Sequence, residues 1–136
     1  MTRFRSARCL TGLASFGFLS TAALHSTGYD SIVDLSRDVP GAMGAVMPAL
    51  WLVFSSDLAV LGLIVGVLAI RPTDVARPVL TIAACCPLVA AGLQLRFIGF
   101  VPPTALLLAL GVLTFVSAAV WPPRAPMAPG GREGTA

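Results

Sequence analysis

The stretch WLVFSSDLAVLGLIVG, residues 51–66, is apolar apart from two serines and Asp57 near its centre. It belongs to a longer apolar segment, about 45–70, that is long enough to cross a membrane, because a hydrocarbon core of about 30 Å takes about 20 helical residues. Three further segments meet this criterion, at about 9–29, 78–95 and 104–121. The sequence therefore predicts an all-α fold, a four-transmembrane-helix bundle over residues 1–121.

The composition supports a membrane protein. Of the 136 residues, 57% are hydrophobic and 11% are charged, whereas soluble domains carry about 25% charged residues. The net charge of +3 comes from arginines dispersed between apolar segments, without the basic face that nucleic-acid binding requires. We therefore expect the lipid bilayer to be the main partner and expect no nucleic acid.

Arginine placement predicts the orientation. With the N-terminus in the cytoplasm, only Arg37 and Arg96 fall outside, and the remaining arginines are cytoplasmic: Arg3, Arg5, Arg8, Arg71, Arg77, Arg124 and Arg132. The positive-inside rule then places both termini in the cytoplasm. Residues 30–41, DSIVDLSRDVPG, are expected to form an outer loop, and the Pro/Gly-rich residues 122–136 are expected to form a disordered cytoplasmic tail.

The first apolar segment has a second interpretation. Its basic start, apolar middle and small residues are also typical of a secretory signal peptide, and cleavage would leave three spans. Retention as a span is favoured, because the apolar stretch is long and continues through HSTGY, residues 25–29, without a strong turn signal.

Asp57 is the most unusual residue of the second span. Thirteen Leu, Ile, Val or Phe residues between Ala49 and Ile70 contribute on the order of −4 to −8 kcal/mol to insertion. A central aspartate costs about 2.5 to 3.5 kcal/mol on the same scale. Insertion is therefore favourable, but the carboxylate is expected to face polar groups inside the bundle.

Three other polar residues are expected near Asp57. His25 lies in the outer half of the first span, and Gln94 and Arg96 end the third span on the same side. Together the four predict a polar binding pocket in the outer half of the bundle. The structural alternatives are an interhelical hydrogen bond for His25, with Thr21 as its partner, and a buried register-locking carboxylate for Asp57.

A stripe of small residues marks another face of the second span. Ser55, Ala59, Gly62 and Gly66 recur at helical spacing, and the two glycines form a G-x-x-x-G pattern, which lets membrane helices approach closely. Asp57 lies about 200° around the helix from Ser55. If Asp57 faces inward, the stripe is free to pack on a second subunit, which predicts a homodimer through this helix.

Metal and cofactor sites are not expected. Cys85 and Cys86 are adjacent, Cys9 is distant, and the single histidine lies far from all three, so the spacing of a metal site is missing. No nucleophile elbow, phosphate-binding glycine loop or H-E-x-x-H motif occurs. These absences argue against the common enzyme classes.

The chain resembles a family of uncharacterised four-helix bacterial inner-membrane proteins, grouped as a domain of unknown function. The residues that carry the resemblance are the histidine of the first span, the W..F..D pattern of Trp51, Phe54 and Asp57, and GFVPPTALLLALGVLTF at 99–115. The resemblance covers about residues 9–121. It implies this architecture and a bacterial plasma membrane, and it implies no activity.

The leading functional hypothesis is a binding or assembly component that takes a lipid or small apolar ligand in the polar pocket. One alternative is a membrane enzyme or proton-coupled carrier that uses Asp57 as its protonatable group and His25 as a relay. Another is a membrane anchor for a partner enzyme.

Overall fold

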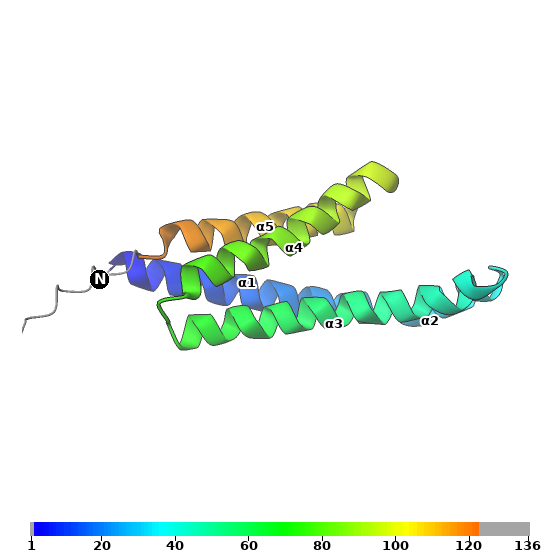
Figure 1. The fold of residues 1–136 in the computed structure, drawn as a ribbon, viewed down its shortest axis with the longest axis horizontal. Helices are drawn as coiled ribbons and strands as arrows, with labels where there is room; N and C mark the ends of the chain where they lie inside the picture. Colours follow the sequence, from blue (N-terminus) through cyan, green and yellow to red (C-terminus); the bar gives the residue numbers. More distant parts are fainter. Residues whose placement is uncertain (1, 123–136) are drawn as a thin grey trace, which may run out of the picture.

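The computed structural model describes residues 2–122, which form five α-helices in an elongated bundle (Figure 1). In chain order they are α1 (Thr2–Ser26), α2 (Tyr29–Arg37), α3 (Ala42–Ile70), α4 (Ala76–Phe97) and α5 (Pro102–Val120). Four helical segments are long and apolar enough to span a membrane. Three of them are α3, α4 and α5, and the fourth, Phe4–Arg37, comprises most of α1 together with α2. The expected multi-pass helical architecture is therefore confirmed at this level.

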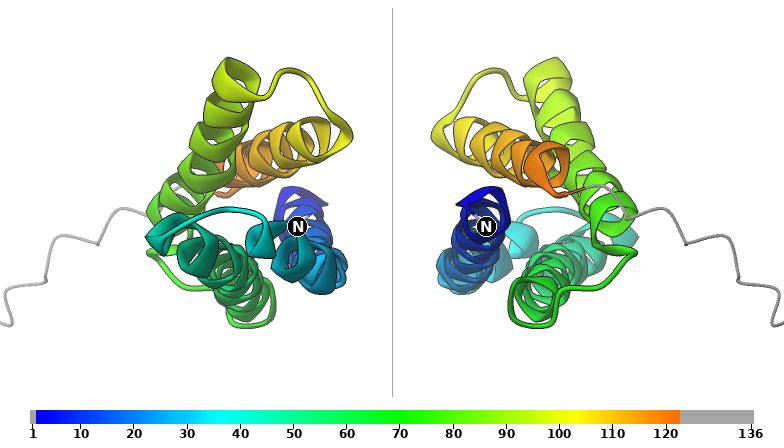
Figure 2. Two further views of the ribbon diagram at one scale, coloured as in Figure 1. Left: turned by 90° about the vertical axis from the view of Figure 1, so that its right-hand side faces the viewer. Right: turned by 90° about the vertical axis from the view of Figure 1, so that its left-hand side faces the viewer.

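The helices form two layers. α1 packs along α3 in one layer and α4 along α5 in the other, and the contact between α1 and α5 joins the layers (Figure 2). α3 and α4, although consecutive, contact each other only sparingly. Away from the end that carries the N-terminus, the layers diverge (Figure 1). We call the two ends of the bundle the terminal end and the far end.

Helix lengths indicate where a bilayer would lie. At 1.5 Å per residue, α4 and α5 are about 33 and 28 Å long, close to the 30 Å of a hydrocarbon core. α3 has 29 residues and is about 43 Å long. Its first turns, together with α2, project beyond α4 and α5 at the far end (Figure 1).

The expectation that residues 30–41 form a loop is corrected, because most of this stretch belongs to helix α2. Asp30 in the first turn and Arg37 in the last complement the helix dipole, and Arg37 pairs with Asp34 at 3.0 Å. α2 packs on α3, and near the start of α3 Gly44 lies against the carbonyl groups of Ser36, in α2, and of Val39, two residues after its end. A helix of nine residues is marginal alone, so this packing explains why it forms.

Small-residue contacts hold α1 against α3. A Cβ atom on Gly62 would lie 2.8 Å from the Leu19 side chain, and one on Gly66 would lie 2.7 Å from the Ser15 hydroxyl. The Ser15 hydroxyl donates a hydrogen bond to the Gly62 carbonyl at 2.7 Å. The G-x-x-x-G stripe is thus a helix–helix contact within one chain, with Ser55 buried and Ala59 half-buried along it. The face expected to meet a second subunit is occupied by α1.

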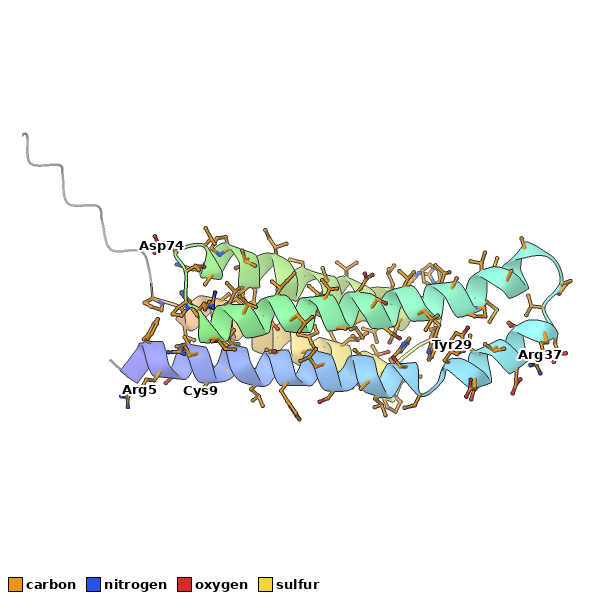
Figure 3. The ribbon with its side chains drawn as sticks, turned by 90° about the horizontal axis from the view of Figure 1, so that it is seen from below. Arg5, Cys9, Tyr29, Arg37 and Asp74 are labelled. Carbon is orange, nitrogen blue, oxygen red and sulfur yellow. The ribbon has the colours of Figure 1, made fainter. Side chains whose placement is uncertain are left out.

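Polar contacts near the terminal end support the same core. The buried hydroxyls of Thr11 in α1 and Ser117 in α5 are hydrogen-bonded to each other. The guanidinium of Arg8 donates to the Ala69 carbonyl at 2.8 Å and so satisfies a free carbonyl at the end of α3. Arg5 and Asp74 also lie at the terminal end, whereas Arg37 lies at the far end (Figure 3).

Prolines lie in the first turn of α5 and inside α3 and α4. Pro102 and Pro103 occupy the first turn of α5, where the missing N–H costs no hydrogen bond. Pro87 lies inside α4 and is buried. The tail expected at 122–136 falls outside the described residues, except for Pro122.

Candidate functional site

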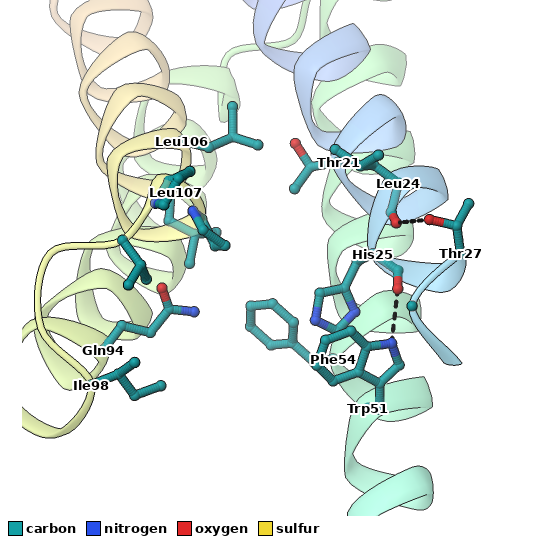
Figure 4. A pocket seen from close by; sticks show the side chains of 14 residues that line it. Thr21, Leu24, His25, Thr27, Trp51, Phe54, Gln94, Ile98, Leu106 and Leu107 are labelled. Carbon is teal, nitrogen blue, oxygen red and sulfur yellow. Dashed lines mark hydrogen bonds between the residues drawn. The ribbon is translucent and has the colours of Figure 1, made fainter. Parts of the chain in front are cut away.

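The divergence of the two layers leaves a cavity at the far half of the bundle. Its volume is about 530 Å³, and it lies between α1 and α3 on one side and α4 and α5 on the other (Figure 4). Most of its lining is apolar, including Leu24, Phe54, Ile98, Leu106 and Leu107. The polar side chains in the lining are Thr21, His25, Thr27 and Gln94. Such a mainly apolar cavity with few polar groups is typical of a small-molecule site.

His25 stands on the α1 wall of this cavity and is fixed by α3. Its imidazole ring is stacked on Trp51, with ring centroids 3.8 Å apart and 17° between the planes. Phe54 contacts the same ring edge-on, at 5.0 Å between centroids. The Trp51 indole N–H donates to the His25 backbone carbonyl at 2.8 Å. The ring and the backbone of His25 are therefore both held in place.

The hydrogen bonds around His25 indicate its tautomer. Nδ1 lies 2.8 Å from the Ser55 hydroxyl oxygen, and that hydroxyl lies 3.0 Å from the Trp51 carbonyl, which it can reach only as a donor. Because a hydroxyl has one proton, both contacts are hydrogen bonds only if Nδ1–H donates to Ser55. In the neutral imidazole Nε2 is then the unprotonated nitrogen, and it is left to accept a hydrogen bond from a molecule in the cavity.

Gln94 stands on the opposite wall. Its Oε1 atom accepts a hydrogen bond from the buried Thr104 hydroxyl at 2.9 Å, which fixes the orientation of the amide. The amide nitrogen then points toward the His25 side of the cavity (Figure 4). The cavity thus presents an acceptor from α1 and a donor from α4 on facing walls.

Asp57 and Arg96 do not take part in this cavity. Asp57 is exposed and lines a separate groove of about 350 Å³ between α3 and α4. Arg96 is exposed, and its guanidinium lies 5.5 Å from the centre of the Phe97 ring. Of the four residues expected to form one pocket, only His25 and Gln94 line the same cavity.

The outward position of Asp57 follows from helix packing. Leu58, Gly62 and Val65 are buried toward the other helices, whereas Asp57 lies at the edge of that buried side, on the groove toward α4, where α3 and α4 contact each other only sparingly. Among residues 2–122, no ion pair or hydrogen bond to the Asp57 carboxylate is found. The expectation that the carboxylate faces polar groups inside the bundle is therefore corrected.

The residues that hold the His25 and Gln94 side chains could not be identified from the interpretations of the sequence given above. Trp51 appears in the sequence only as part of the W..F..D pattern, and Ser55 stands out as part of the small-residue stripe. Their spacing of four residues places both on one helix face, which was the available signal. Thr21, expected as the partner of His25, instead donates to the Gly17 carbonyl at 2.7 Å.

No group of three side chains suited to a metal ion occurs in the part of the chain that the structure describes. Comparison with known proteins found no matching family model, no matching curated protein and no matching solved structure. No family is therefore shown for this chain, and the cavity is the feature from which a function can be inferred.

Proposed function

We propose that this chain is a multi-pass membrane protein that binds an amphiphilic small molecule or lipid in the cavity between its two helix layers. The observation that carries the proposal is the position of His25, whose ring is fixed on one nitrogen by Ser55 and on one face by Trp51. Such fixed polar groups in apolar surroundings are what orient a ligand in a binding site.

The facing polar groups suggest the chemistry of the ligand head. A hydroxyl group donates one hydrogen bond and accepts others. It can therefore donate to Nε2 of His25 while it accepts from the amide of Gln94. The leucine-rich and aromatic lining suits an alkyl chain or another apolar body. A long-chain alcohol has both features.

The fluorescence of Trp51 tests this proposal directly. In a Trp121→Phe background Trp51 is the only tryptophan, and it lines the cavity. The protein is reconstituted into phosphatidylcholine vesicles, and brominated dodecanol is compared with brominated dodecane as a quencher. We expect saturable quenching by the alcohol at concentrations where the alkane quenches only in proportion to its amount in the bilayer. Equal, non-saturating quenching by both would overturn the proposal.

A Gln94→Met variant supplies the control. It keeps the bulk of the side chain but removes the amide donor, so saturable quenching by the alcohol should weaken by about fivefold, as expected for one lost hydrogen bond. In a Leu93→Ala variant, altered at an exposed residue outside the cavity lining, the alcohol should quench Trp51 as it does in the parent.

The arginines of the chain also suggest where it lies and how it is oriented. The terminal end carries Arg5, Arg8, Arg71 and Arg77, and arginine is enriched on the cytoplasmic side of inner-membrane proteins. We therefore propose that the chain lies in a bacterial plasma membrane, with its N-terminus and its C-terminus both in the cytoplasm. The cavity then opens in the outer half of the bilayer.

A further inference from the structure

A second surface of the molecule carries an ionisable group that the cavity does not use. Asp57 is exposed on the side of α3 that faces α4, and the two helices barely meet there. The groove between them is lined by apolar side chains and small ones, among them Leu61, Cys86, Pro87 and Ala90. A single carboxylate therefore stands on an otherwise apolar groove.

The depth of Asp57 places it among lipid chains. It lies thirteen residues before Ile70, the end of α3, or about 20 Å from the terminal end along the helix axis. In a hydrocarbon core of about 30 Å this position is well inside both boundaries. Ionisable groups at such depth rarely face lipid and usually pair with another polar group.

No arginine among residues 4–122 lies at that depth. Arg5, Arg8, Arg71 and Arg77 lie at the terminal end, and Arg37 lies in α2 beyond the bundle. Arg96 lies twenty residues after Ala76, the start of α4, or about 30 Å from the terminal end. A second copy in the same orientation would therefore bring none of these arginines to the level of Asp57.

We propose that the groove between α3 and α4 docks a transmembrane helix of another protein, and that this helix carries a lysine or arginine at the depth of Asp57. Charge complementarity selects the occupant, because a basic side chain would give the carboxylate the partner that it lacks. The small side chains of Cys86 and Ala90 allow the two helices to approach closely, as small residues do in membrane interfaces. The inference does not depend on a ligand in the cavity.

The test uses two synthetic single-span peptides of leucine and alanine, one with a central lysine and one with leucine at that position. The full chain, labelled at its N-terminus, is reconstituted with each labelled peptide in phosphatidylcholine vesicles, and energy transfer is measured at increasing dilution in lipid. We expect the lysine peptide to associate about tenfold more strongly than the leucine peptide. Equal association of the two peptides would overturn the proposal.

Variants of the chain separate the role of Asp57 from general charge effects. Asp57→Asn should abolish the preference for lysine, and Asp57→Glu should retain it. Asp30→Asn removes one carboxylate from exposed helix α2 and should leave the preference unchanged. An Asp57→Asn variant that keeps the preference would contradict the proposal. Self-association of the chain that depends on Asp57 without any peptide would also contradict it, because a second copy would then fill the groove.

Discussion

The imidazole of His25 and the indole of Trp51 lie stacked, with ring centroids 3.8 Å apart and 17° between their planes. A hydrogen bond from the indole N–H to the His25 carbonyl joins the same two residues. Two separate contacts therefore connect α1 and α3 at the cavity wall. The side chains that touch a ligand orient it precisely only when their neighbours hold them rigidly. The contacts between His25 and Trp51 therefore determine the geometry of the site.

A Trp51→Phe substitution tests the hydrogen bond from the Trp51 indole to the His25 backbone carbonyl. Phenylalanine retains an aromatic ring for stacking but lacks the N–H donor, which leaves the His25 carbonyl without that partner. We expect the free energy of unfolding in detergent to fall by about 1 kcal/mol, measured by thermal or denaturant unfolding followed by circular dichroism. Unfolding indistinguishable from that of the parent would show that the hydrogen bond contributes little.

Ser55 and Ser56 provide a matched pair of variants for the contact with the His25 side chain. Ser55→Ala removes the group that holds Nδ1 of His25, whereas Ser56→Ala removes a hydroxyl that bonds only to the Leu52 carbonyl of its own helix. We expect Ser55→Ala to weaken saturable quenching of Trp51 by brominated dodecanol about fivefold, and Ser56→Ala to leave it unchanged. Equal behaviour of the two variants would argue that Ser55 does not position the ring.

Thr104 should position Gln94 through its hydroxyl group. Thr104 is fully buried and donates to Gln94 Oε1 at 2.9 Å. Thr104→Val keeps the shape but leaves the amide oxygen without this donor, so we expect a loss of about 1 kcal/mol in unfolding free energy and weaker binding of the alcohol. Thr104→Ser keeps the hydroxyl and should bind the alcohol as the parent does. Equal binding by the valine variant would contradict the role of Thr104.

The spans could be predicted from sequence because they follow from length and hydrophobicity alone. The predicted segment 45–70 falls within α3, and the predicted segment 104–121 begins two residues after the start of α5. Helix α2 could not be predicted in this way, because its nine residues depend on packing against the start of α3, which no local pattern reports. From sequence the acidic stretch 30–41 is instead interpreted as a loop.

The site was predicted only in part, because depth along a helix does not determine which way a side chain points. His25 and Gln94 lie at similar depth and line one cavity. Asp57 lies in the same half of the bundle but on the side of α3 that faces away from α1. The side of α3 that is buried depends on where the G-x-x-x-G stripe packs, and that stripe packs on α1 of the same chain. Sequence alone left this choice open.

The contact between α1 and α3 should be sensitive to added volume. Gly62→Ala and Gly66→Ala each place a Cβ atom within 3.0 Å of a side chain of α1, and such overpacking typically costs about 1 to 3 kcal/mol. Gly12→Ala and Gly92→Ala are controls, because a Cβ atom at either position meets nothing within 4 Å. We expect the first two to lower the unfolding temperature in detergent and the controls to maintain or raise it. Similar shifts in all four would contradict the close packing.

The orientation should be measurable with single cysteines. In a chain whose three native cysteines are replaced by serine, Asp30→Cys places a thiol on exposed helix α2, and Thr73→Cys places one on the exposed loop between α3 and α4. A maleimide that does not cross membranes is added to intact bacterial cells and to disrupted membranes. Because the arginines gather at the terminal end, where residue 73 also lies, we expect Asp30→Cys to react in intact cells and Thr73→Cys to react only after disruption. The reverse pattern would place the cavity in the cytoplasmic half of the bilayer, and labelling at both positions in intact cells would indicate mixed insertion.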